Sequence, residues 1–100
     1  MLLHTVNKSP FQHAALGSCL RLSKDGSAIL LIEDGIYGAL KDTKISADIE
    51  NAMKTKKVYA LEPDIKARGV QDRVLDGITL VDYAGFVDLA SENDAVEAWL

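Results

Sequence analysis

Residues 28–35 read AILLIEDG, an unbroken apolar run that ends in two acids and a glycine. A short run without polar alternation is typical of a strand that is covered on both faces, as in a parallel sheet. The two acids and the glycine favour a turn directly after it. We therefore expect a central strand from Ala28 to Ile32, followed by a short helix that carries Ile36, Tyr37 and Leu40.

Four other segments around this run have the composition of strands. Three of them are residues 2–6, 57–61 and 78–81. The fourth is the end of the chain, where apolar residues alternate with Glu97 and Trp99 in the period of an edge strand. The apolar members of that alternation are Val96, Ala98 and Leu100.

Helical signals fill the gaps between these strands. The predicted caps and bracketing residues are Ser9 with Pro10, Ser46, Pro63 with Gly69, and Asp82. The first of these helices is expected to run from Pro10 to about Leu22. The last is expected to turn one apolar face toward the core, formed by Tyr83, Phe86, Val87 and Ala90.

Strands that alternate with helices predict an α/β fold, and residues 1–100 have the length of one domain. We expect a compact doubly wound domain with a mainly parallel sheet of four to five strands and helices on both faces. The hydrophobic content of 48% excludes a disordered chain. The formal net charge of −4 argues against direct nucleic-acid binding, which needs clustered lysine and arginine.

The sequence also indicates where the protein works. No apolar run approaches the roughly 20 residues that span a bilayer, so no membrane contact is expected. The first residues lack the basic and then apolar layout of a signal peptide. The single cysteine agrees with a reducing compartment. Together these features predict a cytoplasmic location.

Sites for cofactors and metals are not indicated. The glycine-rich patterns that bind phosphate groups, GxGxxG and GxxxxGK followed by serine or threonine, do not occur, so no cofactor is expected. His4 and His13 have no carboxylate or thiolate at ligand spacing, and a metal site needs three or four converging ligands. We interpret both histidines as structural. Lys54, Lys56 and Lys57 form a small basic group that is typical of a solvated helix end.

The one residue with distinctive chemistry is Cys19. On a helix from Pro10 to Leu22, Phe11, Ala15, Cys19 and Leu22 lie within about 80° of one another, which places the thiol in an apolar stripe. His13 would lie about 120° away around that helix and cannot activate the thiol. This favours a packed cysteine, while a chemical role as a sulfur carrier remains the alternative.

Five blocks of sequence, in order, carry a resemblance to a known family. They are LHTVNKSP at 3–10, LLIEDGIY at 30–37, VYALEPDIKARG at 58–69, VDYAGFVDL at 81–89, and Ala98-Trp99. With these blocks the chain resembles the DsrH/TusB family of sulfur-relay subunits over essentially its full length. The resemblance implies a DsrE/DsrF/DsrH-like fold and the small, non-catalytic or accessory subunit of a sulfurtransferase complex.

The same resemblance implies partners. They are DsrE/TusD-like and DsrF/TusC-like subunits in a heterohexamer that is a dimer of heterotrimers, and a DsrC/TusE-like sulfur carrier that the complex serves. Members of the DsrH type carry a cysteine on the first helix, where Cys19 lies, whereas members of the TusB type commonly lack it. Cys19 therefore favours the branch that supports persulfide transfer in dissimilatory sulfur oxidation. The alternative branch feeds 2-thiolation of the tRNA wobble uridine.

Burial of apolar faces in an oligomer would stabilise so short a chain. The expected interface residues are Val96, Ala98, Trp99 and Leu100, although Trp99 could instead cover the edge of its own sheet. Two other classes of function stay open. They are an independent sulfurtransferase that uses Cys19 and a small nucleotide-binding module that uses the loop at Asp34 and Gly35.

Overall fold

The computed structural model describes residues 1–100, and its centre is a five-stranded sheet in the order β4-β3-β2-β1-β5. All neighbouring strands are parallel. The strands are β1 (Leu2–Val6), β2 (Ala28–Leu31), β3 (Lys57–Leu61), β4 (Thr79–Val81) and β5 (Ala95–Trp99). The central strand, the parallel sheet and the edge strand at the end of the chain are thus confirmed.

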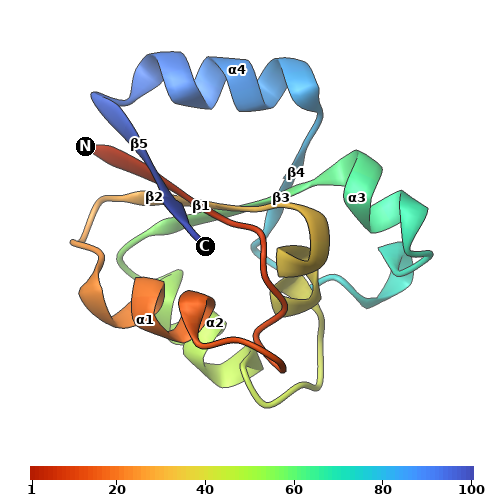
Figure 1. The fold of residues 1–100 in the computed structure, drawn as a ribbon. Coiled ribbons are helices and arrows are strands. Elements are labelled where there is room, and N and C mark those ends of the chain that lie inside the picture. Colours follow the sequence, from red (N-terminus) through yellow and green to blue (C-terminus); the bar gives the residue numbers. More distant parts are fainter.

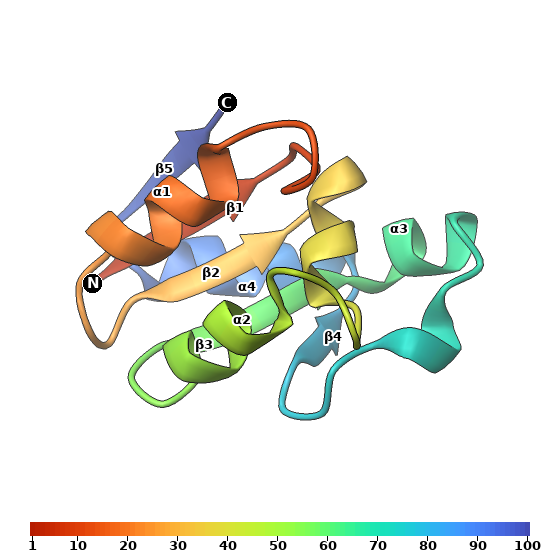
Figure 2. The same ribbon diagram turned by 90° about the horizontal axis from the view of Figure 1, so that it is seen from below.

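Helices cover both faces of the sheet, as predicted for a doubly wound domain. In Figure 1, α4 (Tyr83–Glu92) lies alone above the sheet, and α1 (Ala15–Leu22) and α2 (Ser46–Ala52) lie below it. Figure 2 shows α1 and α2 side by side across that lower face. The remaining elements are α3 (Glu62–Ala67) and two 3₁₀ segments, η1 (Glu33–Ala39) and η2 (Gln71–Arg73).

Strand alternation divides the interior into two cores. The larger core lies between the sheet and the helices α1 and α2. It includes Val6 from β1, Ile29 from β2 and Val58 from β3. The smaller core lies under α4, where Leu3 and Leu30 pack against Leu89. Each central strand thus sends apolar side chains to both faces, which explains the unbroken run at residues 28–32.

Several predicted helix ends are confirmed. The Asp82 carboxylate caps α4, because its Oδ1 accepts a hydrogen bond of 2.8 Å from the backbone N–H of Gly85. Pro63 lies in the first turn of α3, where its missing N–H leaves no helical bond unmade. Gly69 follows that helix with a φ of 65°, a left-handed conformation that favours glycine.

The predicted start of the first helix is wrong. Residues Pro10 to Ala14 precede α1, which begins at Ala15. Ser9 caps a separate turn: its Oγ accepts from the N–H of Phe11 at 3.2 Å, and its carbonyl accepts from the N–H of His13 at 3.0 Å. This local turn satisfies the free N–H groups, so the cap does not require a helix.

Ser46 was predicted to cap α2, but its side chain does not do so. It is the first residue of that helix, and its Oγ donates to the Leu40 carbonyl at 2.9 Å and accepts from the N–H of Thr43 at 2.9 Å. The hydroxyl thus holds the preceding loop. Leu40 lies beyond η1 instead of within it, in an isolated bridge with Val74, because its backbone pairs with another part of the chain.

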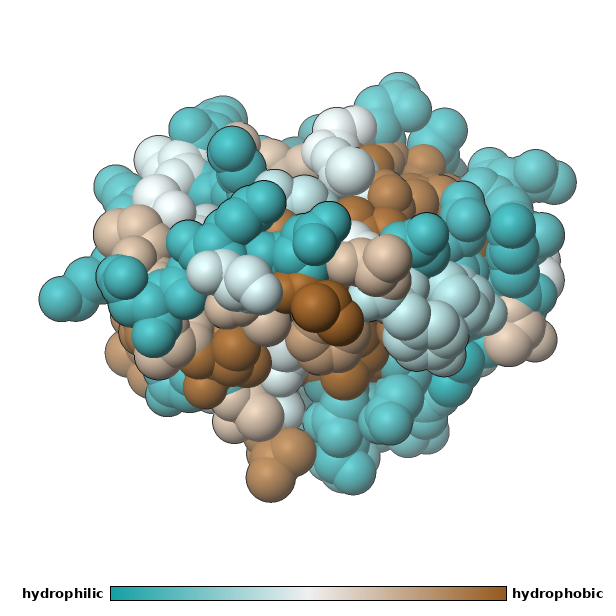
Figure 3. All heavy atoms as spheres, turned by 90° about the horizontal axis from the view of Figure 1, so that it is seen from above, coloured by the Kyte–Doolittle hydropathy of each residue, from teal (hydrophilic) through white to brown (hydrophobic).

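The predicted core face of α4 is only partly buried. Leu89 is the buried residue of this helix, and Phe86 and Ala90 pack partly against the smaller core. Tyr83 and Val87 are 62% and 63% exposed, because the buried face is centred on Leu89 and turns them outward. Figure 3 views this side of the molecule and shows apolar surface interrupted by hydrophilic side chains.

Candidate functional site

Cys19 lies on the buried face of α1, with no exposed surface, inside the larger core. Burial raises the pKa of its thiol to about 12, and the negative charge of Glu97 adds to that increase. Because the nucleophile in sulfur chemistry is the thiolate, the buried thiol is held in its unreactive protonated form.

The residues before Cys19 in the chain do not take the positions that the predicted helix would give them. Phe11 is 51% exposed and lies, with His13, in the turn before α1. Neither residue therefore takes the angular position around Cys19 that a helix from Pro10 would give it. Sequence periodicity identified the apolar environment of the thiol but placed some of its neighbours wrongly.

The expected interface segment forms strand β5, which pairs with β1 along its whole length. Val96 pairs with Leu3 and Ala98 pairs with Thr5, so both point to the α4 side of the sheet. Val96 is 47% exposed, and Leu100, just past the strand, is 85% exposed. The outer edge of β5 has no neighbouring strand in the sheet.

Trp99 is engaged within the domain. It points to the opposite side of β5, packs partly against the larger core, and its indole Nε1 donates to His4 Nδ1 at 3.0 Å. His4 is 2% exposed, and burial lowers the pKa of its imidazole, against the raising effect of Glu97. The Glu97 carboxylate lies 3.7 Å from the same Nδ1 atom.

A polar cluster forms at the carboxyl ends of β2 and β3, where a doubly wound sheet places ligands. Arg68 Nη2 donates to Asp34 Oδ1 at 2.8 Å, and the N–H of Glu33 donates to Asp64 Oδ2 at 2.7 Å. The hydrogen bond to Asp34 raises the pKa of Arg68. The sequence indicated Asp34 as a loop residue but not Arg68, which lies four residues after Asp64, just past the end of α3.

Gly35 explains why this turn is so tightly built. A Cβ atom at this position would lie 2.1 Å from the carbonyl oxygen of Val6 on β1. Glu33, two residues earlier, has a φ of 50°, which is uncommon for a residue with a side chain. The cluster thus satisfies its own charges and fixes the loop that follows β2.

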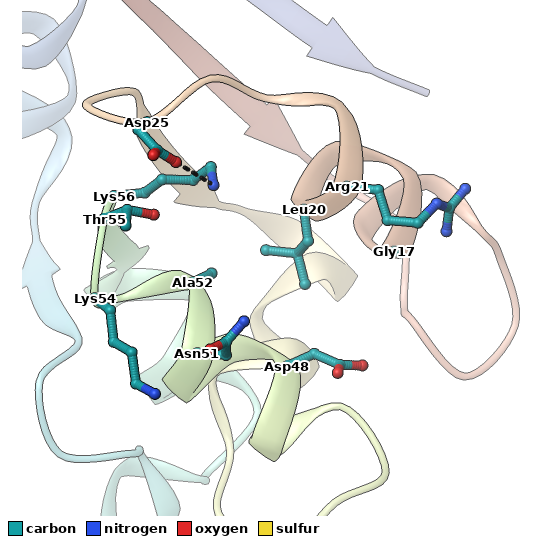
Figure 4. A pocket seen from close by; sticks show the side chains of 10 residues that line it. All are labelled: Gly17, Leu20, Arg21, Asp25, Asp48, Asn51, Ala52, Lys54, Thr55 and Lys56. Atoms are coloured by element: carbon teal, nitrogen blue, oxygen red, sulfur yellow. Dashed lines mark ion pairs between the residues drawn. The ribbon is translucent and has the colours of Figure 1, made fainter.

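A groove of about 600 Å³ lies between α1 and α2 (Figure 4). Lys56 extends into it and pairs with Asp25 at 3.6 Å, while its side chain is only 8% exposed. The prediction of a solvated helix end is therefore wrong for Lys56, whose stem is buried beside Asp25, whereas Lys54 and Lys57 are exposed. In Figure 4, Arg21 and Lys54 point away from Lys56, so the three cations do not converge.

Two structural findings bear on other kinds of site. The chain contains no group of three or more histidine, cysteine, aspartate or glutamate side chains placed to hold a metal ion. None of its helices has the length and apolar character needed to cross a membrane.

The five parallel strands with helices on both faces form a small doubly wound α/β domain, and its single thiol is buried. The family model described as DsrH like protein matches residues 8–96. The chain belongs to this DsrH/TusB family.

The curated relatives agree with that assignment, and a solved structure has the same fold. The chain is 36% identical to Protein TusB of Pectobacterium parmentieri over 100 residues, which covers 98% of this chain and 100% of the relative. It is also 36% identical to Protein TusB of Yersinia pestis strain Pestoides F over 98 residues, with the same coverage. The ychN protein from E. coli has the same fold, with a TM-score of 0.84 at 17% identity over 97% of both chains.

Proposed function

We propose that this chain is a TusB-like subunit of a cytoplasmic sulfur-relay complex that feeds 2-thiolation of the tRNA wobble uridine. Its partners are TusD-like and TusC-like subunits in a dimer of heterotrimers, and the complex serves a TusE-like carrier. The observation that carries the proposal is the 36% identity to proteins named TusB over almost the whole chain.

The sulfur-oxidation branch was favoured by one residue, Cys19. Its burial and its pKa of about 12 weaken that argument, because a protonated thiol without exposed surface is a poor sulfur acceptor. In this proposal Cys19 packs the core under α1. A cysteine of the TusD-like partner carries the persulfide, and this chain acts as a scaffold.

The docking surface in this proposal consists of the free edge of β5, the side chains of β5 on the α4 side of the sheet, and the end of the chain. Val96, Ala98 and Leu100 are exposed there, and β5 contains only one charged side chain, Glu97. An apolar edge strand with few charges is protected when a partner chain packs against it, because its free N–H and C=O groups otherwise pair with other chains. Trp99 contributes indirectly, because its bond to His4 holds β5 on β1.

Co-expression with TusD-like and TusC-like proteins tests this proposal. The three chains should elute together as one assembly in size-exclusion chromatography. Val96→Glu should weaken that assembly, since it places a charge on the proposed interface. Thr79→Glu is the matched control, because Thr79 is exposed on the same side of the sheet at the opposite edge.

Two results would contradict the proposal. One is a stable monomer that ignores both partners. The other is equal assembly of the Val96→Glu and Thr79→Glu variants, which would move the interface away from β5. Stable assembly with DsrE-like and DsrF-like proteins in preference to TusD-like and TusC-like ones would instead support the sulfur-oxidation branch.

A further inference from the structure

The α4 side of the sheet has less helical cover than the opposite side. In Figure 1, α4 lies alone above the sheet, whereas α1 and α2 share the side below it. Neighbouring strands lie about 4.8 Å apart and a helix with its side chains is about 10 Å wide, so five strands need about two helices to cover one face. The larger core contains 12 buried residues, and the smaller core beneath α4 contains 4. This chain therefore leaves the α4 side incompletely covered.

An apolar groove of about 410 Å³ lies on α4 itself. It is lined by Tyr83, Phe86, Val87, Ala90 and Ser91. Phe86 and Ala90 pack partly against the smaller core, whereas Tyr83 and Val87, one helical turn apart, are exposed. Figure 3 shows apolar surface on this side of the molecule, bordered by hydrophilic side chains. Large apolar side chains that are exposed together beside a groove are typical of a surface that binds a protein partner.

The charged side chains of α4 are both acidic. They are Asp88 and Glu92, which lie four residues apart, and neither makes an ion pair within the chain. The strands supply one cation to this side of the sheet, Lys57 at the start of β3. The ammonium group of Met1 is already paired with Asp94 at 2.6 Å. The surface beside the groove is therefore short of cations, which favours a positively charged partner.

We propose that this groove receives an amphipathic helix from a partner subunit of the relay complex. An apolar side chain of that helix packs between Tyr83 and Val87, and lysine or arginine side chains along its flank pair with Asp88 and Glu92. A second copy of this chain does not fit, because it would place the same carboxylates opposite one another. The inference rests on the proposed function and extends its docking surface from β5 to α4, with a stated chemistry for the partner.

Substitution of the exposed apolar residues tests the groove. The full chain is titrated into the purified pair of TusD-like and TusC-like subunits, and calorimetry gives the dissociation constant. Tyr83→Ser and Val87→Ser should each weaken binding at least about fivefold, as expected for side chains near the centre of an interface. Leu22→Ser is the matched control, because Leu22 is 69% exposed on α1, across the sheet, and this variant should bind like wild type. Because all three side chains are exposed, the variants should keep the fold.

Charge reversal tests the chemistry of the partner. A variant with Asp88→Lys and Glu92→Lys should bind the subunit pair at least about tenfold more weakly, because it places like charges opposite one another. The matched control combines Asp48→Lys and Glu50→Lys, which reverse two exposed acids without ion pairs on α2. This control has the same net charge and should bind like wild type.

The outcomes separate this inference from the proposed function. A wild-type chain that does not bind the subunit pair would contradict both. If wild type binds and Val87→Ser binds as tightly as Leu22→Ser, the groove is not part of the interface and only this inference fails. Equal binding of the two charge-reversal variants would overturn the positively charged partner. A wild-type homodimer that Val87→Ser abolishes would identify a second copy as the occupant and overturn the inference as well.

Discussion

Replacing Cys19 with alanine measures what the buried thiol contributes. The side chain has no exposed surface and belongs to the larger core, so the change removes one buried heavy atom and leaves a small cavity. The transfer and cavity contributions together amount to about 1 to 2 kcal/mol in the free energy of unfolding. Cys19→Ser should cost roughly 1 to 3 kcal/mol, because its hydroxyl would be buried without a partner.

Urea unfolding followed by circular dichroism gives these free energies. In the native protein, the thiol should also react far more slowly with a thiol-specific reagent than it does in urea, since it is both buried and protonated. Equal stability of the Cys19→Ala and wild-type proteins would show that the thiol does not stabilise the core. Labelling of the native protein at the rate of an exposed thiol would contradict its burial.

Three further predictions concern stability. The pKa of His4 is lowered below 6.5 in the folded protein, so the unfolded chain takes up the proton first as the pH falls. Stability should therefore decrease as the pH drops below about 6.5. Urea titrations of His4→Phe should show a smaller decrease. Above pH 9 stability should decrease as the pH rises, because the unfolded thiol ionises while Cys19 in the folded protein stays protonated to about pH 12. The free energy of unfolding should fall by up to about 1.4 kcal/mol per pH unit. Cys19→Ala should not show this decrease. Gly35→Ala should lower the unfolding free energy by roughly 3 kcal/mol or more, since its Cβ would overlap the Val6 carbonyl at 2.1 Å; a urea midpoint within error of wild type would show that the turn can relax.

The fold was largely predictable because apolar runs and capping residues act over short distances. Residues 28–32 indicated a doubly covered strand, and the structure places β2 between two helical layers. The Asp82 cap was predictable for the same reason, since its bond to Gly85 spans three residues. The start of α1 was not, because a serine that caps a turn and one that caps a helix look alike in sequence.

The site was less predictable, because it depends on residues that are distant in the chain. The bond from Trp99 to His4 joins residues 95 positions apart, and no local pattern indicates it. Periodicity placed Cys19 on an apolar face, but full burial arises only when α1 packs on the sheet. Lys56 was misinterpreted for a similar reason, since its ion pair with Asp25 joins residues that are distant in the chain.

We propose that this chain supports sulfur transfer within a relay complex without itself carrying sulfur. The most direct measurement is mass spectrometry for persulfide on every cysteine of the complex, purified with its partners during turnover. We expect persulfide on a cysteine of the TusD-like partner, none on Cys19, and normal transfer in the Cys19→Ala complex. An added sulfur atom on Cys19, together with loss of transfer in the Ala variant at full complex occupancy, would contradict it.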